Sequence, residues 1–205
     1  MGVIPGKKER KMGIRASHTA EVIFEDCWIP GDNLVGGEAK LQAKLERAKS
    51  GQKAGKSGAL STFEATRPSV AAQAVGIARA AWEFARDYAK DRQTFGRPII
   101  EHQAIAFKLA DMAMETEAAR LLTHRAAWMA RTGQPFIHAE GSMSKLKAGE
   151  VAVKVTDEAV QILGGYGYIK DFPVEKWHRD AKIYCLFEGT SEIQRLVISR
   201  ALAAE

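Results

Sequence analysis

Apolar side chains after residue 62 recur at spacings of three and four residues, as in Val70, Ala74 and Ile77. This period is typical of amphipathic helices. It predicts three long helices, at residues 68–91, 101–132 and 136–163. Glycine and proline residues separate them, because both are unfavourable inside a helix. Three helices of this length need a fourth to close a bundle.

The fourth long helix is expected at the C-terminus, after a shorter helix at residues 174–179. Thr190 or Ser191 is its expected N-cap, and Ser191 with Gln194 has the spacing of a capping box. An apolar stripe follows, as a core-facing helix requires. We therefore predict a mainly α fold, a four-helix up-down bundle over residues 62–205.

Residues 1–37 have a different pattern, with several glycines and prolines and a strand-like stretch at residues 21–30. We expect Val22, Phe24 and Trp28 to share a buried surface there. Turn-forming residues follow, and the composition then changes. The sequence predicts a short β segment before the helical part of the chain.

Charge is concentrated between the two segments. The 205 residues carry 30 Lys and Arg against 25 Asp and Glu, a net charge of +5 that invites a nucleic-acid interpretation. The stretch from Lys40 to Lys56 has six basic residues and one acidic residue. Its net charge of +5 therefore equals the net charge of the whole chain. No aromatic residue lies among these cations. We therefore expect residues 38–61 to be a basic linker, helical at first and then flexible, and no nucleic-acid partner.

Composition adds limits on class and location. A hydrophobic content of 46% supports a buried core, and the apolar runs are far shorter than the roughly 20 residues of a membrane span. Cys27 and Cys185 are too few for a disulfide scaffold, and the histidines show no metal-ligand spacing, so no metal site is expected. The basic start lacks the apolar segment of a secretory signal. We expect a cytoplasmic location, or the mitochondrial matrix in a eukaryote, although no transit peptide is seen.

Glu188 is the first candidate for chemistry. It lies between the apolar run at residues 183–187 and the predicted terminal helix. A carboxylate there would be partly desolvated and directed at a cleft, which suits a general base. The other interpretation is that an acid before a helix only complements the helix dipole. Position alone favours the second interpretation.

Five separated motifs change that preference. They are FEATRP (63–68), DRQTFGRPIIEHQ (91–103), QILGGYGY (161–168), RDAKIY (179–184) and FEGTSEIQ (187–194). Their order and spacing closely resemble those of the acyl-CoA dehydrogenase family. The opening GKKERKMGIRASHTAEVIFEDCWIP resembles the final strands of the family's middle β-barrel domain. The resemblance implies that residues 1–37 are a remnant of that domain and that residues 62–205 are the C-terminal helical domain, which binds FAD and acyl-CoA.

The resemblance implies FAD-dependent α,β-dehydrogenation of a fatty acyl-CoA thioester to the trans-2-enoyl-CoA. Glu188 matches the base that removes the α-proton while a hydride leaves for the flavin. The backbone N–H of Glu188 and a flavin hydroxyl would hold the thioester oxygen. Some family branches carry the base at a position matching Thr66, which has no carboxylate. Glu64 is near but two positions away, about 200° around a helix.

Further site residues are implied only by the resemblance. The cofactor-binding residues are Arg92, Thr94, Phe95, His102, Gln103, Gln161, Gly164, Gly165, Thr190 and Glu192. The substrate-binding residues are Glu64, Arg67, Glu188 and Gly189. Arg92 is expected at the pyrophosphate of the FAD in a neighbouring subunit, since a guanidinium engages phosphate oxygens in pairs. Local roles are the alternatives: a surface ion pair for Arg92, pairing with Glu64 for Arg67, and a helix C-cap for the two glycines.

The implied partners are an acyl-CoA substrate, an acceptor like electron-transfer flavoprotein, and further copies of the chain in a dimer or tetramer through the bundle. The resemblance also implies a difference from the family, because we expect the family's N-terminal helical domain to be missing from this chain. In the family that domain covers the flavin, and an uncovered flavin is exposed to water and oxygen. The alternative hypothesis is therefore a catalytically incomplete fragment or subunit that acts as an assembly or regulatory partner of a complete dehydrogenase. Arg179 and Asp180 are expected to make structural pairs only.

Overall fold

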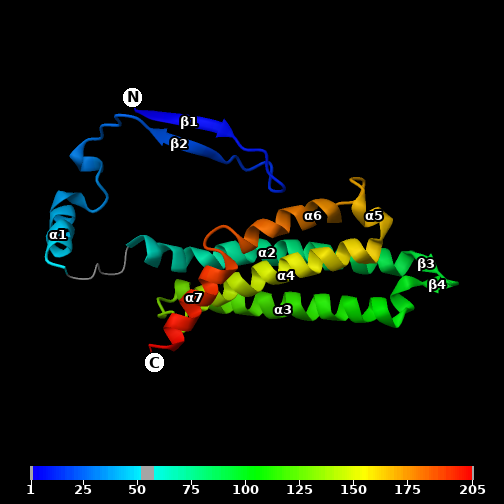
Figure 1. Ribbon diagram of the computed structural model, residues 1–205. Helices are drawn as coiled ribbons and strands as arrows, with labels where there is room; N and C mark the ends of the chain where they lie inside the picture. The colour runs from blue at the N-terminus through cyan, green and yellow to red at the C-terminus, as the bar shows by residue number, and fades with distance from the viewer. Residues whose placement is uncertain (1, 52–57, 205) are drawn as a thin grey trace. The chain divides into compact units, whose positions relative to one another are not determined.

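The computed structural model describes residues 2–51 and 58–204, with only the backbone of residues 58–62 (Figure 1). By its internal contacts the chain divides into two units. The first comprises residues 1–11 with 15–61, and the second comprises residues 12–14 with 62–205. The flexible part of the predicted linker, including Lys53 and Lys56, falls largely on residues 52–57 and lies outside the described residues.

The first unit contains an antiparallel pair of strands, β1 (Val3–Lys8) and β2 (Ala20–Phe24). Val3 pairs with Phe24 and Ile4 with Ile23, and the register shifts between Pro5 and Lys8. A 3₁₀ turn, η1 (Gly31–Asn33), and helix α1 (Gly37–Lys49) follow. None of the residues of α1 is buried, as a basic, solvated helix requires.

The prediction of a shared buried surface at Val22, Phe24 and Trp28 is wrong. Their side chains are 58%, 68% and 84% exposed. A strand pair buries apolar side chains only where a second layer packs on one of its faces, and the described part of this unit contains no such layer.

The second unit is mainly helical, and this confirms the predicted fold class (Figure 1). Its long helices are α2 (Gly58–Asp91), α3 (Gln103–Arg131) and α4 (Glu140–Leu163). Shorter elements are β3 (Gln93–Thr94), β4 (Arg97–Pro98), η2 (Ile99–Glu101), α5 (Gly165–Tyr168), α6 (Val174–Ala181), η3 (Lys182–Cys185) and α7 (Ser191–Leu202). Helix α4 packs on α3 and also on α6 and α7, so two short helices share the fourth place of the bundle.

The core of the bundle is rich in alanine. Helix α2 contributes alanines at helical spacing, each at most 1% exposed: Ala71, Ala74, Ala78, Ala81, Ala85 and Ala89. Helix α4 faces the core with Ala148, Ala152 and Val155. Side chains this small let helix axes approach closely, which fixes the long helices as a rigid support for the loops at their ends.

The first helix starts ten residues earlier than predicted, at Gly58, and Pro68 lies inside it. Proline has no N–H, so the carbonyl of Glu64 four residues before lacks its usual helical donor. Helix α4 covers this position closely: a Cβ added to Gly141 would lie 2.5 Å from the Glu64 carbonyl oxygen. The third helix begins at Glu140, later than predicted, because Ala139 before it has a left-handed conformation with φ 60°.

Arg179 and Asp180 hold residues 12–14 against α6. Asp180 Oδ1 accepts a hydrogen bond from Ile14 N at 2.6 Å, and Arg179 Nη1 donates to the carbonyl oxygen of Met12 at 2.9 Å. Both side chains also form i,i+4 ion pairs within α6, with Lys176 and Glu175. This motif has the structural role that the sequence indicated.

No helix among residues 2–51 and 58–204 is long and apolar enough to cross a membrane.

Candidate active site

Glu188 lies in the tight loop between η3 and α7, in an unusual backbone conformation. Its φ is 55° and that of Gly189 is 88°, so two consecutive residues occupy the left-handed region. This region is unfavourable for a side chain other than glycine, and such strain is concentrated at functional sites. The carboxylate atom Oε2 of Glu188 is buried and has no hydrogen-bond partner among the described residues. The loop therefore holds a partly desolvated carboxylate, with one unpaired oxygen, in a defined position.

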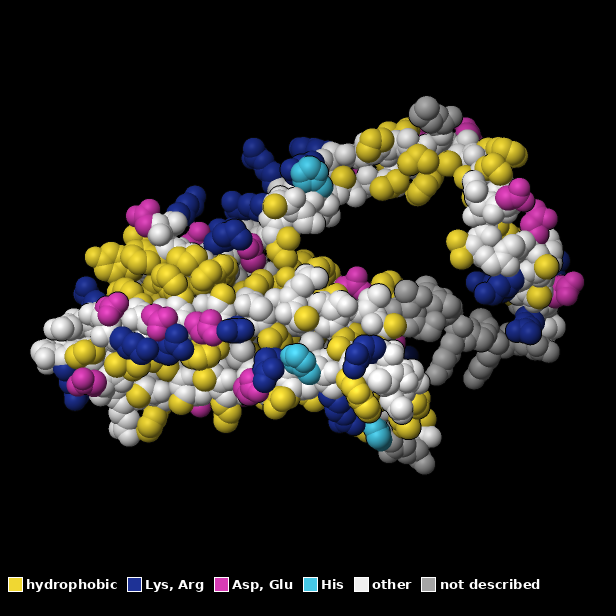
Figure 2. All heavy atoms as spheres, turned by 180° about the vertical axis from the view of Figure 1, so that it is seen from behind, with side chains coloured by type: hydrophobic (Ala, Val, Ile, Leu, Met, Phe, Trp, Pro, Cys, Tyr) yellow, Lys and Arg dark blue, Asp and Glu magenta, His cyan; other side chains and the backbone are white. Residues whose placement is uncertain are grey.

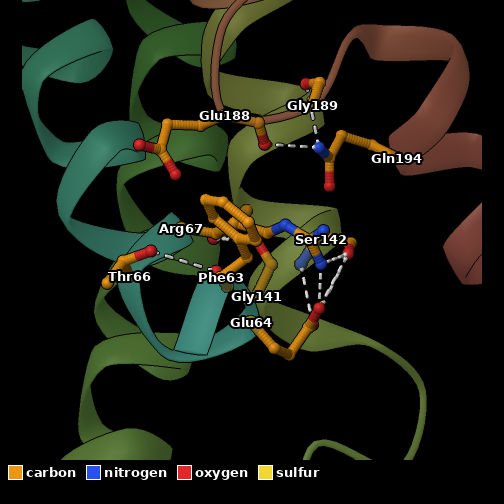
Figure 3. Close-up of polar contacts among 10 residues, drawn as sticks. Phe63, Glu64, Thr66, Arg67, Gly141, Ser142, Glu188, Gly189 and Gln194 are labelled. Atoms are coloured by element: carbon orange, nitrogen blue, oxygen red, sulfur yellow. Dashed lines mark hydrogen bonds and ion pairs between the residues drawn. The ribbon is translucent and has the colours of Figure 1, made fainter. Parts of the chain in front are cut away.

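Two side chains bind the backbone of this loop. Lys145 Nζ, from the second turn of α4, donates to the carbonyl oxygen of Gly189 at 2.6 Å. Gln194 Nε2 donates to the same oxygen at 2.9 Å and to the carbonyl oxygen of Glu188 at 3.1 Å (Figure 3). The capping box of Ser191 and Gln194 does not form, because Gln194 binds the loop instead. Thr190 is the N-cap of α7, and its hydroxyl accepts from Ile193 N at 3.4 Å.

Arg67 and Glu64 form a buried cluster below the loop, as Figure 3 shows. Arg67 is 4% exposed, pairs with Glu64, and donates to Ser142 Oγ at 2.7 Å. The backbone N–H of Ser142 donates to Glu64 Oε1 at 3.2 Å. The local pairing considered for Arg67 is therefore present. Because Glu64 is fully engaged, it offers no second free carboxylate.

The Thr66 side chain makes a hydrogen bond within its own helix, because its hydroxyl donates to the carbonyl oxygen of Phe63 at 3.2 Å. Figure 3 shows the Glu188 side chain pointing from the loop toward helix α2, which carries Thr66 and Arg67. Arg67 Nε and Gln194 Oε1 are also buried without a partner among the described residues. Unpaired buried polar atoms are rare in native proteins and indicate a site for a ligand or an ordered water.

Five of the residues expected to bind the cofactor line one cavity of about 640 Å³ in the bundle: Arg92, Thr94, His102, Gly164 and Gly165. Tyr88 and Tyr166 line it as well, and the guanidinium carbon of Arg92 lies 5.9 Å from the centre of the Tyr166 ring. Apolar side chains gather on this part of the surface, around α5 (Figure 2). Phe95, Gln103 and Gln161 do not line the cavity.

The β3–β4 hairpin forms the edge of this region. Its two-residue turn consists of Phe95 and Gly96, with φ of 51° and 78°. Both values are positive, as in the turn type that matches strand twist in hairpins. The Phe95 ring is 97% exposed, an unusual place for a large apolar residue in a strained conformation. His102 Nε2 lies 3.0 Å from Thr94 Oγ1, which ties the hairpin to the start of α3.

Thr190 and Glu192 lie at the N-terminus of α7. The pKa of the Glu192 carboxyl is lowered by hydrogen bonds, first from its own backbone N–H and then from the Thr190 hydroxyl. Glu192 also lines a separate cavity of about 420 Å³. Among the described residues, no group of three or more His, Cys, Asp and Glu side chains is placed to hold a metal ion.

The two groups of predicted residues do not come together in one chain. Figure 1 shows the β3–β4 hairpin and helix α7 near opposite ends of the long helices. Glu188 and Gly189 precede α7, whereas Arg92 and Thr94 belong to the hairpin. Within one copy of the bundle the two groups are therefore apart.

Lys145, Gln194 and Ser142 are the residues that sequence reasoning missed. Lys145 is 1% exposed and Gln194 and Ser142 are 0% exposed. The sequence contains one signal: Lys145 precedes the buried Ala148 and Ala152 by three and seven positions, so its place in the helical period is on the core face. Burial lowers the pKa of the Lys145 ammonium.

Comparison with known proteins then identifies the family. The sequence model described as "Acyl-CoA dehydrogenase, C-terminal domain" matches residues 53–203. The chain belongs to the acyl-CoA dehydrogenase family. The resemblance seen in its motifs is thereby confirmed.

Relatives within this family agree over nearly all of the chain. It is 48% identical over 201 residues to the probable acyl-CoA dehydrogenase FadE25 of Mycobacterium tuberculosis. The matched region covers 98% of this chain and 48% of the relative. It is 49% identical over 198 residues to the mitochondrial short-chain specific acyl-CoA dehydrogenase of Bos taurus, with 97% and 44% covered. The chain thus spans about half the length of the curated relatives it matches.

Solved structures show the same fold. Butyryl-CoA dehydrogenase from Megasphaera elsdenii superposes with a TM-score of 0.83 at 42% identity, over 98% of this chain and 49% of that one. A chain from the structural study named "Electron transferring flavoprotein of Acidaminococcus fermentans" gives a TM-score of 0.88 at 45% identity, over 100% of this chain and 50% of that one.

Proposed function

We propose that this chain is part of an FAD-dependent acyl-CoA dehydrogenase that converts a fatty acyl-CoA thioester to the trans-2-enoyl-CoA. Glu188 removes the α-proton. The observation that carries the proposal is the buried, unpaired Oε2 of Glu188 in a strained loop, at the position where the family motif carries its base. A free carboxylate in a desolvated site is suited to accept a weakly acidic proton.

The backbone of the same loop has a second role. As the α-proton leaves, negative charge develops on the thioester oxygen, and a donor already in place stabilises it. The Glu188 N–H is the proposed donor, together with a hydroxyl of the cofactor. Gly189 continues the loop in a conformation that only glycine adopts freely. Bound FAD supplies the acceptor for the β-hydrogen, which leaves as a hydride.

The cavity beside the hairpin fits the anionic part of FAD. Arg92 faces it with a guanidinium suited to a pyrophosphate, and His102 and Thr94 add polar groups. Gly164 and Gly165 leave open space at its wall, since an added Cβ at either residue meets no atom within 4 Å. Phe95, Gln103 and Gln161 are proposed to reach the cofactor from the rim, and Thr190 and Glu192 to bind it at the α7 end.

An assembly of at least two copies is part of the proposal. The Glu188 loop and the Arg92 cavity lie near opposite ends of one bundle, so a flavin contacted by both needs loops from two subunits. The outer face of α3 offers a surface for such contact. It carries large apolar side chains every seven residues, each 52–61% exposed: Phe107, Met114, Leu121 and Trp128. Such a stripe is typical of a helix that packs on another copy.

Partners and setting follow from the same proposal. We propose acyl-CoA as substrate, a role in fatty acid β-oxidation, a homotetramer, and electron transfer to a partner like electron-transfer flavoprotein. The last is supported by the similarity to a chain studied with the electron transferring flavoprotein of Acidaminococcus fermentans. The cytoplasmic or mitochondrial-matrix location stays a prediction.

The alternative function is that of a catalytically incomplete partner of a full-length dehydrogenase. The observation that favours it is that the Glu188 loop and the Arg92 cavity lie near opposite ends of one bundle, so a single copy does not bring them together. The two functions differ in one experiment. The purified chain is mixed with FAD under anaerobic conditions and titrated with butyryl-CoA while the flavin absorbance is followed. Bleaching supports the dehydrogenase, whereas protein that never retains FAD supports the incomplete partner.

A further inference from the structure

Lys145 is the most deeply buried cation among the described residues, and nothing in the proposed reaction uses it directly. Its side chain is among the largest with less than 2% exposure. It forms no ion pair with a carboxylate of the described residues, and its hydrogen bond goes to the Gly189 carbonyl oxygen. Burying an ammonium without an anionic partner is costly for stability. A protein that keeps such a group at its active site has a functional reason for it.

The backbone that Lys145 binds is the part of the Glu188 loop that needs support. Glu188 and Gly189 both have positive φ, and the first is not glycine. Lys145 and Gln194 together place two donors on the Gly189 carbonyl, and Gln194 adds one to the Glu188 carbonyl. These bonds fix two successive peptide planes. The direction of the Glu188 side chain, toward α2, follows from those planes (Figure 3).

The space around Gly189 shows that the contact is tight. A Cβ at residue 189 would lie 2.6 Å from Gln194 Nε2. The loop therefore depends on glycine at 189 for both its conformation and its closeness to Gln194. Lys145 and Gln194 reach it from two different helices, α4 and α7.

The ammonium of Lys145 lies among other charged and titratable groups. The charged and titratable groups around the ammonium are Arg67 on α2, Cys185 on η3, Glu188 in the loop and Glu192 on α7. Arg67 is paired with Glu64. Lys145 is thus the nearby cation without an anionic partner, and the polar contact that it makes is its hydrogen bond to the Gly189 carbonyl oxygen.

We propose that Lys145 and Gln194 are positioning residues for the base: they hold the Glu188–Gly189 loop in its left-handed conformation. This role rests on the proposed function, because it assigns two residues to the same reaction. Neither residue touches the reacting atoms.

The test compares the full chain with Lys145→Met, Gln194→Met and the control Lys147→Met. Lys147 lies two residues away on α4 and pairs with Glu115, outside the loop. Two quantities are measured with FAD present: backbone amide exchange at residues 188–190, and exchange of the α-protons of butyryl-CoA in D₂O. Binding of butyryl-CoA is measured in parallel.

We expect amide exchange in the loop to become at least about 10-fold faster in both test variants, since they lose hydrogen bonds to the loop carbonyls. Exchange of the α-protons should slow by about 100-fold, as a misplaced catalytic group does, with little change in butyryl-CoA affinity. Lys147→Met should match the wild type in loop amide exchange, α-proton exchange and butyryl-CoA affinity.

Two results overturn the positioning role alone. One is that both test variants exchange the α-protons at the wild-type rate, and the other is that their loop amides exchange at the wild-type rate. If the variants lose stability but keep the rate of α-proton exchange, the two residues are structural only and the proposal is again overturned. A wild-type chain that never exchanges the α-proton removes the proposed function itself, and the positioning role falls with it.

Discussion

Gly141 in α4 lies so close to Glu64 in α2 that a Cβ at residue 141 would be 2.5 Å from the Glu64 carbonyl oxygen. This carbonyl is the one that Pro68 leaves without a helical donor. The contact therefore joins the two helices at the level of the Arg67 cluster, where Ser142 binds both Arg67 and Glu64.

The first prediction concerns this contact. Gly141→Ala should lower the free energy of unfolding by about 1–3 kcal/mol, because the added methyl group meets backbone that has no room to move. Gly76→Ala is the matched control, since a Cβ at this exposed position of α2 meets no atom within 4 Å. Alanine is the better helix former, so the control should gain up to about 1 kcal/mol. Urea denaturation measures both, and equal stability of the two variants would refute the close approach.

The second prediction uses the pKa of Lys145, which burial lowers below its ordinary value of 10.5. Between the lowered value and the ordinary value, the unfolded chain binds the proton that the folded chain has lost. Stability therefore rises with pH in that window. The free energy of unfolding of the wild type should rise relative to that of Lys145→Met as the pH increases toward the ordinary lysine pKa of 10.5. A difference that stays constant over this range would contradict the burial of the ammonium.

The third prediction concerns the hairpin turn. Phe95→Gly should leave stability unchanged or raise it by up to about 1 kcal/mol, because glycine adopts a positive φ without steric cost. Binding of FAD should weaken, because the exposed ring at the rim is lost. Thermal unfolding and flavin fluorescence measure the two effects. If Phe95→Gly lowers stability and retains FAD fully, Phe95 has a structural role and no role in cofactor binding.

The fourth prediction concerns the apolar stripe on α3. Leu121→Glu places a charge in the middle of this stripe and should dissociate the proposed oligomer. Gln42→Glu adds the same charge at an exposed position of helix α1, which does not carry the stripe, and should leave the oligomer intact. Analytical ultracentrifugation gives the mass of each. A Leu121→Glu variant with the mass of the wild type would exclude this face from the interface.

How much of the structure the sequence predicts depends on how far apart along the chain the interacting residues lie. The helical periods place α3 within two residues at each end, because the core side chains that define the period are local in sequence. The predicted start of α2 is wrong because Pro68 lies inside the helix, in a packing environment that depends on Gly141, a residue on another helix. The exposure of Val22 and Phe24 depends on whether a second layer is present, which no local pattern reports.

In the candidate site, too, the residues that depend on local motifs are predicted and those that depend on long-range contacts are not. Family motifs indicate Glu188 and the residues of the Arg92 cavity, and five of the latter do line one cavity. The two side chains that hold the Glu188 loop were missed. Gln194 matched a capping box by spacing, but the loop carbonyls compete for its amide. The contact of Lys145 with the loop joins residues 44 positions apart, so only the fold brings them together.

The central claim is that Glu188 is the base, and exchange of the α-protons of butyryl-CoA in D₂O, with FAD present, tests it most directly. The wild-type chain and the control Glu117→Gln, on the exposed face of α3, should exchange these protons at the same rate. Glu188→Gln should be slower by at least about 100-fold, because the amide does not accept the proton. Equal exchange in the wild type and in Glu188→Gln, with butyryl-CoA bound by both, would contradict the account.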